Sequence, residues 1–320
     1  MKLPENVCGG LPNNVIVIER GWLNCNQILL LDPLGAENIL IDSGYSTHTE
    51  TTLNLLRAPE NLGSANLTRI INTHCHSDHM GGNAAVQQKY GCAITVPAGE
   101  ARHLRPWDAQ AIWMGYADQY AQPFEFDAVM HAGDSFEGGG LTWRALAAPG
   151  HDTDALMFWC ATERVIITGD ALWQDGLGFV FPQASADGSN PLIDAALQTL
   201  MVIERCDPAI IIPGHGAPFG GGEIPTAIAR ARSRLQAFAL DPAKNARHVM
   251  KVMFVFALLH RQSMRSADLP AYIAKVPCYA DLNKFLQLSV DEIANWLVAD
   301  LVRAGAITVE QGTIYPLQNP

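Results

Sequence analysis

The chain has 320 residues, of which 48% are hydrophobic and 17% are charged, and its formal net charge is −11. These values predict a globular, soluble protein of one large or two ordinary domains, with enough apolar material for a core. No apolar run reaches the roughly 18–20 residues that cross a bilayer, and no secretory signal is recognisable, so we expect no membrane partner.

The first part of the chain alternates predicted strands and helices. Runs rich in β-branched and large aliphatic residues, bounded by Gly, Asn or Pro, predict strands over residues 14–19, 26–32, 38–44, 67–74 and 92–97. A helix is predicted over 47–57, with Thr47 or Thr49 as its N-cap, and another within 79–91 that stops at Gly91. This alternation indicates an α/β fold.

A second series follows the same scheme. Strands are predicted over residues 141–150, 154–160, 164–170 and 209–216, with a helix over 190–206. Two strand-rich halves, each with its own helices, would suit two sheets packed face to face with helices outside.

Residues 223–320 differ in character. Helices are predicted over 223–240, 247–262 and 289–305, the last beginning with a capping box of Ser289 and Glu292. Residues 306–317 alternate like a hairpin with Gln311-Gly312 at its tip. Helices followed by a hairpin resemble a winged-helix module, so we predict a catalytic domain over 1–222 and a smaller C-terminal domain over 223–320.

The run INTHCHSDHMGG, residues 71–82, contains the pattern HxHxDH. Residues two apart on an extended chain point to the same side, so His74 and His76 can face one point while Cys75 faces away. A turn after His76 lets Asp78 and His79 reach a second point nearby. Imidazole and carboxylate are the ligands expected for Zn(II), Fe(II) or Mn(II).

Three further potential ligands lie at the ends of predicted strands, next to glycine. His151 follows the segment APG, Asp170 ends VIITGD, and His215 lies in IIIPGHG. Each alone is compatible with an ordinary turn residue. Together with HxHxDH they form one coherent metal site.

This ordered series resembles the metallo-β-lactamase superfamily over roughly residues 14–216, and THCHSDHMGG is particularly similar to the glyoxalase II version of its motif. The resemblance implies an αββα sandwich that binds two divalent metal ions, with Zn favoured and Fe or Mn as alternatives. It assigns the ligands as follows: one metal to His74, His76 and His151, the other to Asp78, His79 and His215, with Asp170 bridging them.

Such a centre implies hydrolysis by a metal-bridging hydroxide, with Asp78 as a catalytic residue that orients the nucleophile. Asp170 distinguishes the chain from true β-lactamases, which generally have Cys or Ser there, and favours glyoxalase II, lactonases or nucleases. The basic cluster that binds glutathione in glyoxalase II is not evident. Its nearest counterparts are Arg230, Arg232 and Arg234, which we expect to be solvated surface residues.

Aromatic residues are frequent in two segments that could border the metals. Residues 98–132 either pack as a helix on the core or form a lid or wall over the metals. Residues 171–182 directly follow Asp170. An apolar wall would favour an ester, thioester or lactone. The aromatic residues concerned are Trp107, Trp113, Tyr116, Tyr120, Phe124, Phe126, Trp173, Phe179 and Phe181.

Charge is unevenly placed and separates the hypotheses about partners. Residues 1–243 carry 13 Lys+Arg and 26 Asp+Glu, a net charge of −13, whereas residues 244–320 carry 8 and 6, a net charge of +2. The acidic part should repel phosphate backbones, so we favour a small-molecule substrate over nucleic acid. A ribonuclease or phosphodiesterase that uses the winged-helix-like domain is the alternative, and that domain could instead mediate a homodimer.

Two further expectations concern the metal count and the compartment. Persulfide dioxygenases of the same fold use one iron, but the full ligand set of this chain favours two metals. The seven cysteines are odd in number, widely spaced and without a CxxC motif, which argues against a disulfide framework and favours a cytoplasmic location.

Overall fold

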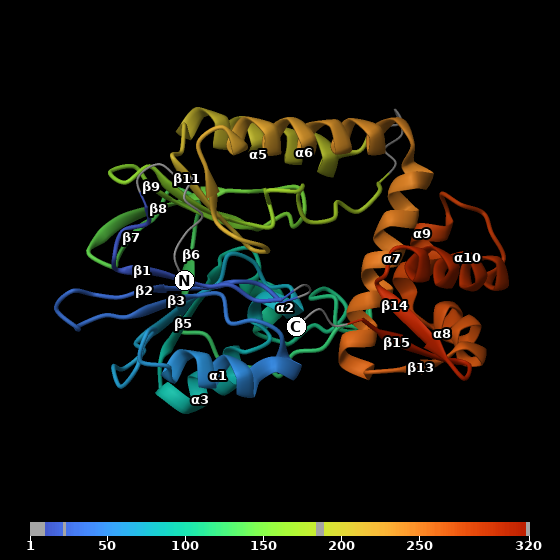
Figure 1. Cartoon of the computed structure of the whole chain (residues 1–320), viewed down its shortest axis with the longest axis horizontal. Helices are drawn as coiled ribbons and strands as arrows, with labels where there is room; N and C mark the ends of the chain where they lie inside the picture. The colour runs from blue at the N-terminus through green and yellow to red at the C-terminus, as the bar shows by residue number, and fades with distance from the viewer. Residues whose placement is uncertain (1–9, 22–23, 184–188, 318–320) are drawn as a thin grey trace.

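The computed structural model describes residues 10–21, 24–183 and 189–317. Within these residues, two six-stranded sheets pack face to face (Figure 1). Helices α5 (Pro191–Cys206) and α6 (Glu223–Leu240) cover the outer face of one sheet, and α1 (Thr49–Arg57) and α3 (Asn83–Tyr90) cover that of the other. This arrangement confirms the predicted αββα sandwich.

The first sheet is antiparallel over its first three strands and parallel over the rest. Two of the three parallel pairs are joined through helices α1 and α3, because a crossover between parallel strands needs a long connection. Gly91 ends α3 with φ +64°, as its pattern predicted. In spatial order the strands are β1 (Val15–Ile18), β2 (Gln27–Leu30), β3 (Ile39–Ile41), β4 (Arg69–Ile71), β5 (Ala93–Pro97) and β6 (Ala128–Met130).

The second sheet is antiparallel except for one parallel pair, β10 with β11, which α5 connects. The Asn190 side chain caps α5 by accepting hydrogen bonds from the backbone N–H groups of Leu192 and Ile193. In spatial order its strands are β12 (Phe219–Gly220), β11 (Ile210–Pro213), β10 (Val165–Gly169), β9 (Leu156–Cys160), β8 (Leu141–Ala147) and β7 (Ser135–Gly138).

The core between the sheets consists of the inward-facing side chains of both. Trp143 on β8 and Phe158 on β9 are fully buried there, together with Ile28 of the opposite sheet. The Trp143 indole satisfies its one donor by a 3.0 Å hydrogen bond to the carbonyl oxygen of Gly138. A closely packed core of this kind fixes the two sheets, and therefore fixes the loops that leave their edges.

Helix α6 packs with the sandwich. Its residues Ile228, Ala231 and Leu235 lie in the same apolar cluster as Leu200 of α5 and Ile211 of β11. The domain boundary at residues 222 and 223 stays a prediction. The packing of α6 favours a boundary at Asp241, where this helix ends and the next begins.

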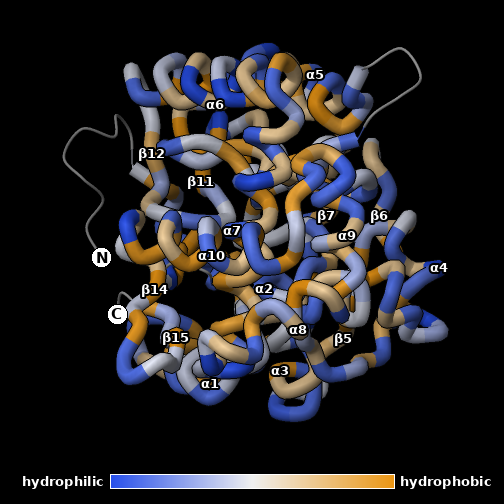
Figure 2. Tube along the Cα trace, turned by 90° about the vertical axis from the view of Figure 1, so that its right-hand side faces the viewer, coloured by the Kyte–Doolittle hydropathy of each residue, from blue (hydrophilic) through white to orange (hydrophobic). Residues whose placement is uncertain are grey.

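The C-terminal part has the predicted order of helices followed by a hairpin, and Figure 2 views it from its own side. The capping box of Ser289 and Glu292 is present, and the hairpin pairs with a short third strand. Its elements are α7 (Pro242–Arg261), β13 (Met264–Arg265), η2 (Ser266–Asp268), α8 (Leu269–Lys275), α9 (Pro277–Asn283), α10 (Val290–Arg303), β14 (Ile307–Glu310) and β15 (Thr313–Pro316).

The aromatic segment after β5 is not a long helix. Only α4 (Ala101–Leu104) is helical, and turns follow it, with left-handed backbone at Trp107, Trp113 and Asp118. The helical alternative for residues 98–132 is therefore wrong, because left-handed residues interrupt the helical hydrogen-bond ladder.

Two expectations about the chain as a whole can be compared with the described residues. None of their helices combines the length and apolarity needed to cross a membrane. All six of their cysteines are free thiols, in line with the absence of a disulfide framework. The seventh, Cys8, lies outside the described residues.

Candidate metal centre

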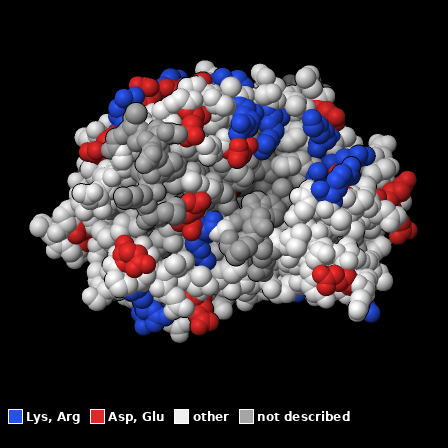
Figure 3. All heavy atoms as spheres, viewed as in Figure 1, with Lys and Arg blue, Asp and Glu red and all other residues white. Residues whose placement is uncertain are grey.

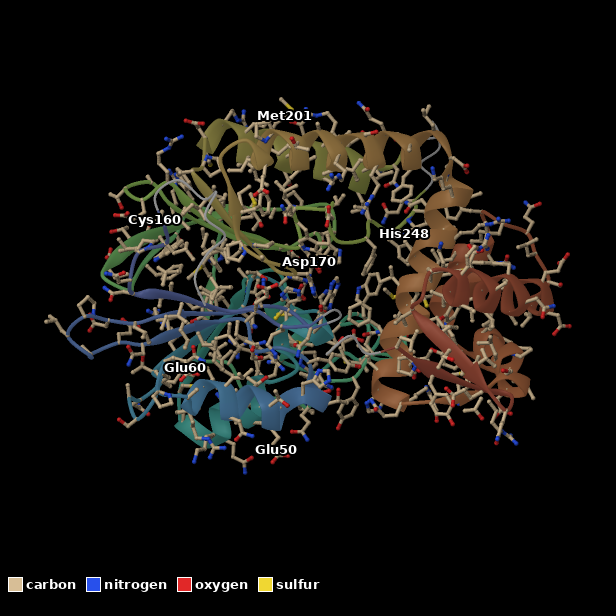
Figure 4. The ribbon with its side chains drawn as sticks, in the orientation of Figure 1. Glu50, Glu60, Cys160, Asp170, Met201 and His248 are labelled. Atoms are coloured by element: carbon tan, nitrogen blue, oxygen red, sulfur yellow. The ribbon has the colours of Figure 1, made fainter. Side chains whose placement is uncertain are left out.

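The seven predicted ligands come from five places along the chain and meet at one end of the sandwich. His74 and His76 follow β4, and Asp78 and His79 lie on the one-turn helix α2 (Ser77–Met80). The other three follow β8, β10 and β11, and Figure 4 shows the middle one, Asp170, between the sheets on the side of the C-terminal part. The ligand atoms form two groups, each within 4.8 Å: His74, His76 and His151, and Asp78, His79, Asp170 and His215.

The first group consists of three buried imidazoles. His76 Nδ1 lies 2.8 Å from His151 Nε2, and the His74 ring is 4.8 Å from that of His76 between centroids. The Nδ1–H group of His151 donates a 2.6 Å hydrogen bond to the carbonyl oxygen of Phe179. This contact leaves the free electron pair of the His151 ring on Nε2, which faces His76 in the same ligand group.

The second group combines imidazole with carboxylate. His215 Nε2 lies 3.1 Å from Asp78 Oδ2, and His79 Nε2 lies 3.6 Å from the same oxygen. The indole of Trp173 packs against the His215 ring at 4.8 Å between centroids and restrains it. Nitrogen and carboxylate oxygen atoms converge here as they do around protein-bound divalent cations.

Asp170 lies between the two groups. Its Oδ1 atom is 3.3 Å from His79 Nε2 and 3.6 Å from His215 Nε2, both in the second group. Its Oδ2 atom is 3.4 Å from His151 Nε2, in the first. One carboxylate therefore presents one oxygen to each group, which is the placement required of a bridging ligand.

The electrostatics of the ligands suit cation binding. Burial lowers the pKa of His76 and of His151 to about 4, so both imidazoles keep a free electron pair at neutral pH. Burial alone would raise the pKa of Asp170, but His215 and His79 outweigh it and hold this pKa well below its usual value. Asp170 is therefore ionised.

Orphaned nitrogens among the ligand imidazoles suit the binding of a divalent cation. The Nε2 atoms of His74 and His79 are buried and have no hydrogen-bond partner. Buried polar atoms are almost always paired, so such exceptions indicate a ligand position. Both atoms face the groups described above, and their donor type matches Zn, Fe or Mn.

Glycines make room for this crowding. A side chain at Gly81 or Gly82 would place its Cβ 2.3 Å from a backbone oxygen, of Ser77 or of Ser43. A Cβ at Gly214 would lie 2.5 Å from Asp170 Oδ1. The glycines at 81, 82 and 214 are therefore required by the close approach of neighbouring groups.

Asp42, at the end of β3, is a supporting residue that the sequence analysis missed. Its Oδ2 atom accepts hydrogen bonds from His79 Nδ1–H and from the Thr73 hydroxyl, and its Oδ1 atom accepts one from the backbone N–H of Thr73, at 2.8 Å each. These contacts orient the His79 ring so that Nε2 faces the second group. The sequence run IDSG, residues 41–44, is the local signal that could have indicated Asp42, but the same run is compatible with an ordinary turn.

Asn26 was missed as well. Its side-chain amide donates to the carbonyl oxygens of Pro213 and Gly216, at 3.0 and 2.7 Å, and so clamps the loop that carries His215. The two ends of this clamp are almost two hundred residues apart in sequence, and no local pattern marks Asn26.

The ligands open into a cavity of about 480 Å³. Trp113, Leu177 and Phe179 form part of its wall, which confirms that the aromatic segments border the site. Phe179 stacks nearly parallel on the His76 ring, 5.9 Å between centroids. Helix α7 supplies the opposite wall, which was not foreseen, through His248, Val252, Met253 and Phe256.

The fold and the two ligand groups define a metal-dependent hydrolase. Residues 20–215 match the family model of the metallo-beta-lactamase superfamily, and the chain belongs to this superfamily. The family match spans the first ligand, His74, through the last, His215. The protein is thus a metallohydrolase of the metallo-β-lactamase fold.

Curated relatives refine this assignment. The chain is 26% identical over 204 residues to an uncharacterised protein of Mycobacterium leprae, which covers 61% of this chain and 88% of that one. It is 31% identical over 137 residues to the hydroxyacylglutathione hydrolase of Rhodopseudomonas palustris strain BisA53, covering 43% of this chain and 44% of that enzyme. The matched stretch thus spans less than half of the hydroxyacylglutathione hydrolase.

Two solved structures share the fold over nearly the whole chain. A metallo-beta-lactamase family protein from Thermus thermophilus has a TM-score of 0.56 and 19% identity, covering 96% of this chain and 100% of that one. A beta-lactamase domain protein from Burkholderia ambifaria has a TM-score of 0.57 and 21% identity, with 96% of each chain covered. The C-terminal part is therefore included in the shared fold.

Proposed function

We propose that the protein hydrolyses a small acyl ester, thioester or lactone at a centre of two divalent cations, most simply Zn(II). The observation that carries this proposal is the position of Asp170, with one oxygen toward each ligand group, at the floor of a cavity with apolar walls. The relatives named hydroxyacylglutathione hydrolases act, as that name says, on an acyl thioester.

In this proposal His74, His76 and His151 would hold one cation and Asp78, His79 and His215 would hold the other, with Asp170 as a ligand available to both. When bound, such a pair of cations lowers the pKa of a shared water and polarises a carbonyl group. The carboxylate of Asp78 accepts a hydrogen bond from the attacking water and fixes its direction. Trp113 and Phe179 hold the acyl group and exclude bulk water from it.

Phosphodiester cleavage is the second candidate, and one observation favours it: a basic groove adjoins the cavity. The metal cavity argues against phosphodiester cleavage, because the apolar side chains of Leu177, Val252 and Phe256 provide no charge or hydrogen bond to a phosphate backbone. We therefore place acyl hydrolysis first.

A hydrolysis panel on the metal-loaded enzyme tests the choice. Acyl thioesters, aryl esters, acyl-homoserine lactones, cyclic phosphodiesters and RNA are compared, and metal content per chain is measured by mass spectrometry. We expect two cations per chain and turnover of the carbonyl substrates. Turnover confined to phosphodiesters, or a single bound cation in the active enzyme, would contradict the proposal.

The role of Trp113 gives a sharper prediction. In Trp113→Ala, kcat/KM for an octanoyl thioester should fall about tenfold relative to the acetyl thioester of the same thiol, because the loss of apolar contact costs about 1–2 kcal/mol. Trp107→Ala is the control, since Trp107 lies in the same segment but packs on Phe124. An equal loss for both chain lengths would show that Trp113 does not contact the acyl group.

A further inference from the structure

A second, larger groove adjoins the metal cavity. It has a volume of about 940 Å³ and lies between α6 and α7, and it shares Arg234 and His248 with the metal cavity. Figure 3 shows Lys and Arg side chains gathered near the hollow on this face, and Figure 4 shows His248 on α7. The charged residues of the groove are Arg230, Arg234, Asp241, Lys244, Arg247, Lys251 and Asp300.

Three of these cations are not neutralised by protein carboxylates. Lys251 lies 3.5 Å from Asp300, and Arg230 is paired with Asp175. Arg234, Lys244 and Arg247, in contrast, have no ion-pair partner within the described residues. In a chain of net charge −11, such a concentration of unpaired Lys and Arg side chains beside the metal cavity indicates a binding site for an anionic ligand.

The Asp241 carboxylate offsets only part of this charge, because the groove holds, among the described residues, five Lys and Arg side chains against two carboxylates, those of Asp241 and Asp300. Asp241 accepts a 2.9 Å hydrogen bond from the backbone N–H of Lys244 and so caps α7. Burial first, then Arg234 and Lys251, lower the pKa of His248 to about 4, so its imidazole is neutral at pH 7. A neutral imidazole in a basic groove can still offer a ring N–H to an anion.

Arg234 is positioned at the junction between groove and cavity. Its Nη2 atom donates a 3.1 Å hydrogen bond to the carbonyl oxygen of Asp175. Its guanidinium lies against Gly176, where a Cβ would be only 2.3 Å from Nη1. Gly176 belongs to the loop that begins at Asp170. Because Gly176 has no side chain, this loop leaves room for the Arg234 guanidinium.

We propose that this groove binds phosphate groups of the substrate, so that the substrate is an acyl ester or thioester of a phosphorylated alcohol or thiol. The inference rests on the proposed function: the acyl group lies in the apolar cavity and the phosphates lie on Arg234, Lys244 and Arg247. Water adds to the acyl carbon, the bond from that carbon to sulfur or oxygen breaks, and the leaving atom takes a proton.

The size and placement of the groove favour a small phosphorylated molecule over RNA. Its volume is near the upper end of the roughly 300–1,000 Å³ of small-molecule sites, so it exceeds the needs of a single phosphate. A further cavity, near Tyr116 and Phe285, shares Trp113 and His151 with the metal cavity and has Lys284 as its only Lys or Arg among the described residues, with Asp152 and Asp281 beside it. A continuous cationic track for a polynucleotide is therefore absent across the described part of the site.

The test compares two thioesters with the same acyl group. Butyryl-coenzyme A carries phosphates, and S-butyryl-pantetheine carries the same thiol arm without them. We expect kcat/KM to be at least tenfold higher for the phosphorylated substrate and to fall with added salt. In the double variant Lys244→Gln, Arg247→Gln this ratio should fall about tenfold, because each exposed cation–phosphate contact contributes up to about fivefold.

Arg232→Gln is the matched control, since Arg232 lies on α6 but pairs with Glu204 at 2.7 Å outside the groove. It should keep the ratio of the wild type. Equal kcat/KM for the two thioesters, unchanged in the double variant, would overturn the inference while leaving the proposed acyl hydrolysis intact.

An equilibrium measurement separates the two proposals if neither thioester is hydrolysed, a result that would contradict the proposed function. Adenosine 3′,5′-bisphosphate is then titrated calorimetrically into the wild type and the double variant. Binding that weakens about tenfold in the variant supports the phosphate groove, and no binding to the wild type overturns it. RNA cleavage that is lost in the double variant would also overturn it, in favour of a polynucleotide.

Discussion

Replacement of Asp170 by alanine should remove one bound cation per chain and lower kcat about a thousandfold, because two-cation stabilisation contributes several kcal/mol. The reason is geometric: the carboxylate lies 3.3 Å from His79 in one ligand group and 3.4 Å from His151 in the other. Alanine leaves both groups without a shared oxygen. Metal content by mass spectrometry and steady-state kinetics measure the two effects.

The fold of the Asp170→Ala variant should persist. Asp170 lies in the loop beyond β10, whose residues Val165 and Ile167 keep their places in the core. Glu163→Ala is the matched control, because this exposed carboxylate precedes the same strand at its opposite end. Two cations per chain and full turnover in the Asp170 variant, with an unchanged circular dichroism spectrum, would exclude a bridging role.

Replacement of Asp42 by asparagine should weaken metal binding about 10–100-fold, the range found for residues that orient a metal-bound histidine. The substitution keeps the size of the side chain but turns an acceptor-only group into one that also donates. Its new NH2 group would face either the backbone N–H of Thr73, in the place of Oδ1, or the Nδ1–H of His79 and the hydroxyl of Thr73, in the place of Oδ2. Competition with a chromophoric chelator measures the affinity.

Asp32→Asn is the control for Asp42→Asn. Asp32 accepts backbone hydrogen bonds from Leu34 and Ala36 in an exposed turn that connects β2 with β3. It is remote from the ligand groups, so its removal changes the charge equally but leaves the histidines untouched. A metal affinity in Asp42→Asn equal to that of Asp32→Asn would show that His79 is oriented without Asp42.

The candidate ligands could be predicted from the sequence because each stands in a short context with a physical meaning. HxHxDH follows a buried strand, Asp170 follows Gly169, which has a left-handed φ of +50°, and His215 follows Gly214, where a Cβ would lie 2.5 Å from Asp170 Oδ1. The supporting contacts could not be predicted in this way. Asn26 acts on a loop near residue 215, and no single-residue pattern encodes a pairing over that distance.

The strands of the sandwich were predicted where they are long and apolar. Strand β12 has only two residues, and β7, Ser135–Gly138, has one large apolar side chain, Phe136, so neither gives a period-2 signal. The expectation that Arg230, Arg232 and Arg234 are all solvated surface was wrong for Arg234. Arg234 lines the metal cavity, since the partner of α6 at this point is the loop that follows β10, in the same half of the sandwich.

The wall that α7 contributes to the metal cavity has a consequence for how this enzyme can diversify. The groups that would hold the cations belong wholly to the sandwich, whereas Val252, Met253 and Phe256 belong to the appended C-terminal part. One wall of the cavity thus belongs to a different stretch of chain from the ligands. Substitutions confined to α7 can therefore change which compounds fit the cavity, while the residues that would hold the cations stay the same.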